Sequence, residues 1–161
     1  MIDINITHKA AETCGLDWDA LLVRAEKATL DALPAYKDLV AECSVIVCDD
    51  ATIQGLNADF RAKDKPTNVL SFPQFDAFEV PKDGEHYIGD IAMSYDTLAR
   101  EASDGDVALA DHATHLFVHS FLHLFGYDHI DDADAELMEA LEIRILATLN
   151  IKNPYLIHEE L

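Results

Sequence analysis

The chain has 161 residues, of which 50% are hydrophobic, and 31 acidic against 11 basic residues give it a formal charge of −20. This length favours a single domain over residues 1–161, and the apolar content excludes a disordered chain. The acidic balance argues against tight binding of free nucleic acid by the whole surface, because a field of that sign repels phosphate.

The first third of the chain predicts two strands and two helices. Apolar and polar residues alternate over 2–6, which indicates a strand. A helix is expected from Asp17, which can cap it, to Pro34, which ends it. A short buried strand over 43–48 then precedes a helix that begins at Asp49.

The middle of the chain predicts two more strands. Residues 61–66 are polar and end in proline, which indicates a loop. Strands are expected over 67–72 and 87–94, with an exposed loop over 74–86 between them. A short helix over 96–102 follows the second of these strands.

Two helices complete the predicted elements. The first covers 107–125, with a cap within 104–106, and is apolar on more than one side, so it should be the central and most buried helix. The acidic run over 130–134 caps the last helix, whose apolar stripe contains Leu137, Met138, Leu141, Ile145 and Leu149. Four strands and about five helices predict an α+β fold, with helices packed on a small mixed four-stranded sheet.

Three histidines near the end of the central helix have the spacing of metal ligands. His119 and His123 lie four residues apart, which is about 40° around a helix axis and roughly 6 Å along it, so they share a face. Gly126 can end the helix and let His129 return to the same ion. Three neutral imidazoles leave one tetrahedral position open, as in catalytic zinc sites. We therefore predict one Zn²⁺ per chain, and ordinary packing roles are the alternative.

The same spacing occurs in a large group of zinc peptidases, with one difference. Those peptidases carry Glu directly after the first histidine, where it acts as general base. Ser120 occupies that position here and cannot act as a base near neutral pH. The residues thus predict a metal site without the peptidase base, which makes a peptidase the less favoured alternative.

The segment 119–129, His-Ser-Phe-Leu-His-Leu-Phe-Gly-Tyr-Asp-His, resembles the signature of the YbeY endoribonucleases, with Ser120 where that signature has Gly. Two further segments are similar to the family, within 56–73 and over 89–94. With Met138 and Glu142, the resemblance covers most of the chain from about Leu56 onward. It implies a sheet-and-helix fold and a metal-dependent endoribonuclease.

The resemblance also implies a substrate and partners. They are single-stranded RNA, the 3′ end of small-subunit rRNA, and the small ribosomal subunit, in rRNA maturation and ribosome quality control. An acidic surface suits the basic proteins of that subunit. Neither DNA nor a membrane is an expected partner.

Three of the basic residues fall within five positions: Arg61, Lys63 and Lys65. A guanidinium can stabilise charge that develops on phosphoryl oxygens, because its planar fork donates two hydrogen bonds and stays charged. The resemblance implies the same, since the matching arginine of the family is taken as catalytic. We predict that Arg61 is catalytic and that Lys63 and Lys65 contact the RNA backbone. The alternative is a solvated charged loop.

Several polar residues leave alternatives open. Asp90 and Asp128 are candidate hydrogen-bond partners of the ligand histidines, although Asp128 could instead fix the turn after Gly126. His115, one turn before His119, should pack or hydrogen-bond rather than bind the ion. No Glu or His is identifiable as a general base. Three other histidines, in termini or a loop, are expected to have no special role: His8, His86 and His158.

The cellular setting and a rival function follow from the same sequence. Three cysteines, Cys14, Cys43 and Cys48, lack a C-x-x-C spacing and suit reduced thiols. With no apolar run of about 18 residues and no secretion signal, we expect a cytoplasmic protein. The rival from another class is a non-catalytic, metal-stabilised ribosome assembly factor. A protein ligand closing the fourth coordination position would favour that rival.

Overall fold

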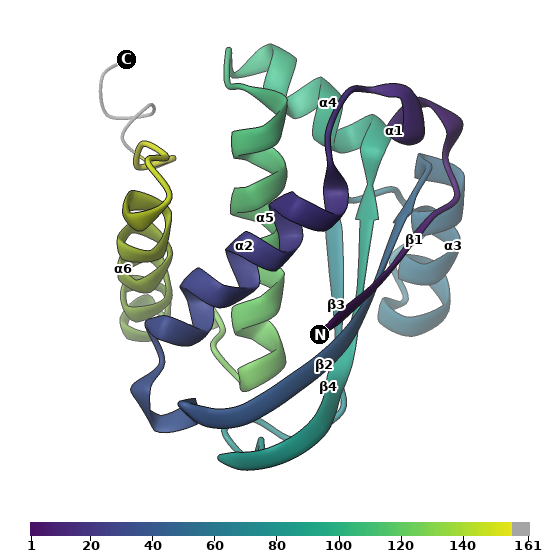
Figure 1. Ribbon diagram of the computed structural model, residues 1–161. Coiled ribbons are helices and arrows are strands. Elements are labelled where there is room, and N and C mark those ends of the chain that lie inside the picture. Colours follow the sequence, from purple (N-terminus) through teal and green to yellow (C-terminus); the bar gives the residue numbers. More distant parts are fainter. Residues whose placement is uncertain (156–161) are drawn as a thin grey trace.

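The computed structural model describes residues 1–155, so His158 lies outside the described residues. Within that range the chain forms four strands and six α-helices, with a short 3-10 helix over Pro34–Tyr36 (Figure 1). The strands are β1 (Ile2–Ile6), β2 (Asp38–Cys48), β3 (Val69–Pro73) and β4 (Asp83–Ser94). The helices are α1 (Lys9–Thr13), α2 (Trp18–Asp31), α3 (Asp50–Arg61), α4 (Tyr95–Asp104), α5 (Leu109–Phe125) and α6 (Asp132–Thr148). The predicted α+β class is confirmed.

The sheet is mixed, as predicted, and its strand order is β1-β2-β4-β3. β1 and β2 are parallel, as are β2 and β4, whereas β3 runs antiparallel to β4. Within residues 1–155, β3 is therefore an edge strand, with one side that no other strand covers. That uncovered edge faces the candidate site described below.

Helix α5 is the centre of the fold. It packs against α2, α4 and α6 and against strands β3 and β4 (Figure 1). Phe117, Phe121 and Phe125 on this helix are fully buried, which confirms the prediction of a central, buried helix. α3 packs over the opposite face of the sheet, on a small separate cluster with Ile53 and Leu70. None of the described helices is long and apolar enough to cross a lipid bilayer.

Two strands begin earlier than their sequence predicts. β2 starts at Asp38 and β4 at Asp83, and these two residues pair in register. This outer part of the ladder is solvated on one side, with buried Leu39 and Ala41 alternating with exposed residues. Gly84 and the polar residues beside it indicate a loop in isolation, but pairing with β2 supplies the backbone hydrogen bonds of a strand.

Two helix ends differ from the prediction, and one short helix was not predicted. Arg61 is the last residue of α3 rather than part of a loop, because Ala62 ends the helix in the left-handed conformation at φ 56°. α5 begins after Ala108 without a side-chain cap, so the predicted cap within 104–106 is wrong. The missed helix α1 is only five residues long and is capped by His8, whose ring accepts a hydrogen bond from the Ala10 N–H at 3.3 Å. His8 thus has a structural role that its sequence context did not indicate.

Some large apolar side chains of the helices lie at the surface. Phe60 of α3 and Leu137 of α6 are 66% and 54% exposed. Phe60 still packs edge-to-face on Phe72, at 5.3 Å between ring centroids. The three cysteines are free thiols, as predicted.

Candidate active site

The three motif histidines gather at the C-terminal end of α5. Their ring nitrogens offer ligand atoms that lie within 4.8 Å of one another. The Nε2 atoms of His119 and His123 are 3.0 Å apart. Gly126 ends α5 at φ 110°, and a Cβ there would meet the backbone nitrogen of Phe78 at 2.6 Å, so the tight turn toward His129 requires glycine. The group can hold one metal ion.

The donor chemistry fits a metal ion. Nδ1 of His119 lies 2.5 Å from a carboxylate oxygen of Glu142, which can only accept, so Nδ1 carries the proton and the Nε2 lone pair is free. Burial, and then the nearby charge of His119, lowers the pKa of His123 to about 4. His123 is therefore a neutral imidazole near neutral pH, which is the form that binds metals.

Glu142 of α6 is the functional residue that the sequence interpretation did not assign. Its side chain is fully buried and accepts hydrogen bonds from His119, from Nε2 of His115 at 3.2 Å, and from the Tyr155 hydroxyl. Burial is the largest influence and would raise the pKa of this carboxyl. The hydrogen bonds from His115 and His119, with the charge of His119, outweigh burial and lower the pKa to about 2.

A sequence signal for Glu142 did exist. The residue lies on the buried stripe of α6, four positions after Met138 and three before Ile145. A charged side chain on such a stripe requires buried partners. The helix pattern alone could not name those partners, because they come from α5 and from the segment after α6.

The two aspartates proposed as partners of the histidines have different surroundings. Asp128 accepts a hydrogen bond from the His129 backbone N–H at 2.7 Å, and the same oxygen lies 3.5 Å from Nδ1 of His129. It thus fixes the turn and also flanks the ring. Asp90 is exposed on β4 and accepts a hydrogen bond from the Tyr87 hydroxyl, away from the histidines. The buried carboxylate beside the histidines is Glu142, not Asp90.

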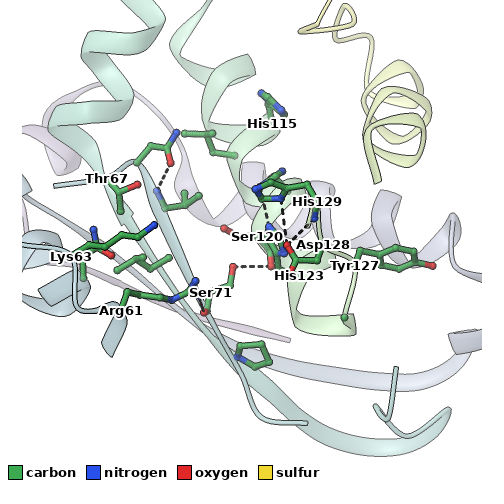
Figure 2. Close-up of a pocket in the computed structure, with 18 of the residues that line it drawn as sticks. Arg61, Lys63, Thr67, Ser71, His115, Ser120, His123, Tyr127, Asp128 and His129 are labelled. Carbon is green, nitrogen blue, oxygen red and sulfur yellow. Dashed lines mark hydrogen bonds and ion pairs between the residues drawn. The ribbon is translucent and has the colours of Figure 1, made fainter. Parts of the chain in front are cut away.

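Arg61 reaches the site from the other face of the sheet. Its Nη2 donates to the Ser71 carbonyl on β3 at 2.9 Å. The Ser71 hydroxyl in turn donates to the Ser120 carbonyl on α5 at 3.1 Å (Figure 2). Because Ser120 directly follows His119, these two hydrogen bonds tie the guanidinium to the helix that carries the histidines.

One cleft of about 730 Å³ contains the predicted site residues. Figure 2 shows Arg61 and Lys63 across the cleft from His123 and His129. The loop that carries the lysines is held at Asn57, whose side-chain amide donates to the Lys65 carbonyl at 3.0 Å. Lys65 lines the same cleft, so all the basic residues predicted for RNA share it with the metal group.

The metal group is open on the cleft side. Within residues 1–155, no fourth His, Cys, Asp or Glu offers a ligand atom to the group. His115 lines the cleft but directs Nε2 at Glu142, in agreement with the expectation that it does not bind the ion. The Ser120 side chain is fully buried, and its hydroxyl has no partner among the described residues. The described residues would thus leave one position at a bound ion for water or substrate.

The fold and the site together define a small α+β protein with an open three-histidine metal group that faces basic residues across a cleft. The family model described as Endoribonuclease YbeY matches residues 4–150. The chain therefore belongs to the YbeY endoribonuclease family.

Individual relatives agree with the family model. Endoribonuclease YbeY of Sphingopyxis alaskensis is 48% identical over 159 residues, covering 92% of this chain and 95% of its own length. The protein of the same name from Rhizorhabdus wittichii is 42% identical and covers 99% and 100% of the two chains. A solution structure from Thermotoga maritima, 22% identical, matches the fold with a TM-score of 0.57 and covers 93% and 92%.

Proposed function

We propose that this protein is a zinc-dependent endoribonuclease for single-stranded RNA, acting in the cytoplasm on the 3′ end of small-subunit rRNA and in ribosome quality control. The observation that carries the proposal is the shared cleft, in which the three histidines face Arg61, Lys63 and Lys65. A hydrolase of phosphodiesters needs both components within reach of one phosphate.

Each residue has a stated part in this proposal. His119, His123 and His129 would hold the ion, and zinc is the choice because three histidines with an open position are typical of catalytic zinc. When bound, the ion supplies Lewis acidity at a phosphoryl oxygen and makes water more acidic. Glu142 keeps the His119 ring oriented and its Nε2 unprotonated.

The basic residues would bind and orient the RNA strand. Arg61 is exposed but fixed through Ser71, so its remaining donors can engage the scissile phosphate with little loss of side-chain entropy. Lys63 and Lys65 would attract the flanking phosphates. Single-stranded RNA is favoured because a flexible, unpaired strand can adapt its backbone to a cleft more easily than a duplex can.

The net charge of the whole chain supports basic proteins as its partners. A formal charge of −20 repels free RNA over most of the surface and suits basic proteins of the small ribosomal subunit. RNA presented by the ribosome would meet the locally basic cleft. Neither DNA nor a membrane has a part in this proposal.

Two rivals are less well supported. A metal-stabilised assembly factor without catalysis needs no open coordination position, and the described residues leave one open. A peptidase needs a general base directly after the first metal-binding histidine. The residue at that position here is Ser120, which is buried and cannot act as a base near neutral pH.

Cleavage of labelled RNA by purified, metal-analysed protein tests the proposal. We expect the protein to cut single-stranded RNA and to spare the duplex, and His123→Ala to lose both metal and activity. His112→Ala is the matched control, because His112 is on the same helix but hydrogen-bonds Glu101 outside the metal group. A metal-loaded protein that cuts neither form of RNA, alone or on small ribosomal subunits, would favour the assembly factor.

A further inference from the structure

The hydrogen bonds between β3 and β4 determine which backbone groups of β3 point to its uncovered edge. The hydrogen bonds at its two ends run from Ser94 N to the Asn68 carbonyl and from Gln74 N to the Ile88 carbonyl, both at 2.9 Å. Hydrogen-bonded pairs alternate along an antiparallel ladder, so Leu70 and Phe72 bond to β4 as well. The backbone groups of Val69, Ser71 and Pro73 must then point to the uncovered edge. All three residues line the cleft.

Of the three residues that face this edge, Val69 and Pro73 have no free N–H for an anion. The Val69 N–H donates to the side-chain oxygen of Asn68 at 2.7 Å. Pro73 has no N–H. The Ser71 carbonyl accepts from Arg61 at 2.9 Å. Among residues 1–155, nothing accepts from the Ser71 N–H, which leaves it as the one unpaired N–H donor of β3.

We infer that the backbone N–H of Ser71 donates a hydrogen bond to the substrate. Together with the Arg61 guanidinium, it would bind a phosphoryl oxygen of the RNA strand. The N–H and C=O of one strand residue point to the same edge, so the guanidinium on the Ser71 carbonyl lies beside the free N–H. This pair of donors also lies next to the three histidines, because the Ser71 hydroxyl donates a hydrogen bond to the carbonyl of Ser120, the residue after His119. The inference rests on the proposed function.

The surroundings favour a phosphate over a peptide as the occupant. An added peptide strand needs alternating donors and acceptors along the edge, and β3 offers a single free N–H. Arg61, Lys63 and Lys65 line the same cleft and supply positive charge. A backbone donor with a guanidinium is a common way to bind a phosphodiester oxygen.

Amide proton shifts of the metal-loaded protein test the inference directly. The probes are a cleavage-resistant 2′-O-methyl oligoribonucleotide and its neutral methylphosphonate analogue. We expect the phosphodiester probe to move the Ser71 amide proton downfield and to slow its exchange with solvent, and the neutral analogue to do neither. Leu70 and Phe72 are internal controls, because their N–H groups are already bonded to β4. Binding of the charged probe without a change at Ser71, or an equal change with the neutral one, overturns the inference.

A pair of variants adds a kinetic test. Ser71→Pro removes the N–H without breaking a ladder bond, since this N–H faces away from β4. Ser71→Ala keeps the N–H and loses the same hydroxyl. We expect kcat/KM for RNA to be about ten- to a hundredfold lower in the proline variant than in the alanine variant, as for loss of a hydrogen bond to a charged group. Equal values in two folded variants overturn the inference but leave the proposed nuclease intact. If the proline variant does not fold, the amide shifts decide.

Discussion

Glu142 of α6 accepts a hydrogen bond from Nδ1 of His119 at 2.5 Å, and this contact joins the last helix to the metal group on α5. The carboxylate is fully buried, yet three donors compensate its charge: His119, His115 and Tyr155. The contact leaves only Nε2 of His119 available for a metal ion. The orientation of the His119 ring therefore depends on a residue 23 positions later in the chain.

Glu142→Gln should weaken metal binding. The neutral amide accepts a weaker hydrogen bond from Nδ1 of His119 than the carboxylate does. Loss of a hydrogen-bond partner of a metal-binding histidine costs about ten- to a hundredfold in metal affinity. Competition with a chelator measures the affinity. Glu139→Gln is the matched control, because Glu139 is exposed on the same helix. An affinity for Glu142→Gln equal to that of the control would show that the contact does not orient the ligand.

Tyr155→Phe should weaken metal binding less than Glu142→Gln does. The change removes one donor to Glu142 and keeps the ring, which packs edge-to-face on His115 at 5.7 Å between centroids. Tyr155 lies beyond residues 4–150, the segment that matches the family model.

Tyr87→Phe is the matched control for that change. It also removes a tyrosine hydroxyl that donates to a carboxylate, that of Asp90, but on β4 away from the metal group. The same chelator competition should show a lower affinity for Tyr155→Phe than for this control. Equal affinities would mean that the Tyr155 hydroxyl only holds the segment directly after α6 against that helix.

Acid should destabilise the metal-free protein in a defined pH window. Burial and the charge of His119 lower the pKa of His123 from 6.5 to about 4. Between these values the unfolded chain binds more protons than the folded one, so stability present above pH 6.5 is lost as the pH falls toward 4. Glu142, with its pKa lowered from 4.5 to about 2, loses its contribution in a lower window.

Urea unfolding of metal-free protein across this pH range measures the effect. The wild type should lose stability between pH 6.5 and about 4, and His123→Gln should lose less over that interval because it lacks the group. Parallel curves for the two proteins would contradict the assignment of this window to His123.

The sequence predicted the elements better than the contacts between them. The spacing of His119, His123 and Gly126 is a local property of one helix and its end, so the gathering of the ligands could be foreseen. The position of Arg61 across the same cleft could not, because it depends on how α3 and α5 pack on opposite faces of the sheet. The same limit hid the partners of Glu142 and the pairing that extends β2 and β4.

Ser120→Ala should leave the protein as stable as the wild type or more stable. The Ser120 hydroxyl is buried with no partner among the described residues, and an unpaired buried hydroxyl costs free energy. Alanine also has the higher helix propensity. Ser71→Ala is the contrast, because that hydroxyl donates to the Ser120 carbonyl at 3.1 Å, and its loss should cost about 1 kcal/mol. Urea unfolding measures both, and a loss of more than about 1 kcal/mol in Ser120→Ala would reveal a partner for its hydroxyl.

Arg61→Ala should lower the rate of RNA cleavage more than it weakens RNA binding. If the guanidinium stabilises charge that develops on the phosphoryl oxygens, its loss should cost about a hundred- to a thousandfold in the saturated rate. Arg61→Lys keeps the charge but cannot both hold the Ser71 carbonyl and present a planar fork, so it should recover little of that loss. Single-turnover cleavage of labelled single-stranded RNA at saturating enzyme measures the rate.

Lys63→Ala is the matched control for the Arg61 variants, because Lys63 lines the same cleft but has no hydrogen bond to β3 among those in the described part of the chain. A lysine that only attracts the RNA backbone adds to binding and to its salt dependence, and leaves the saturated rate unchanged. A salt series run beside the single-turnover assay therefore separates the two roles. If Arg61→Ala behaves like Lys63→Ala, raising only the concentration needed for saturation, Arg61 binds RNA without acting on the transition state.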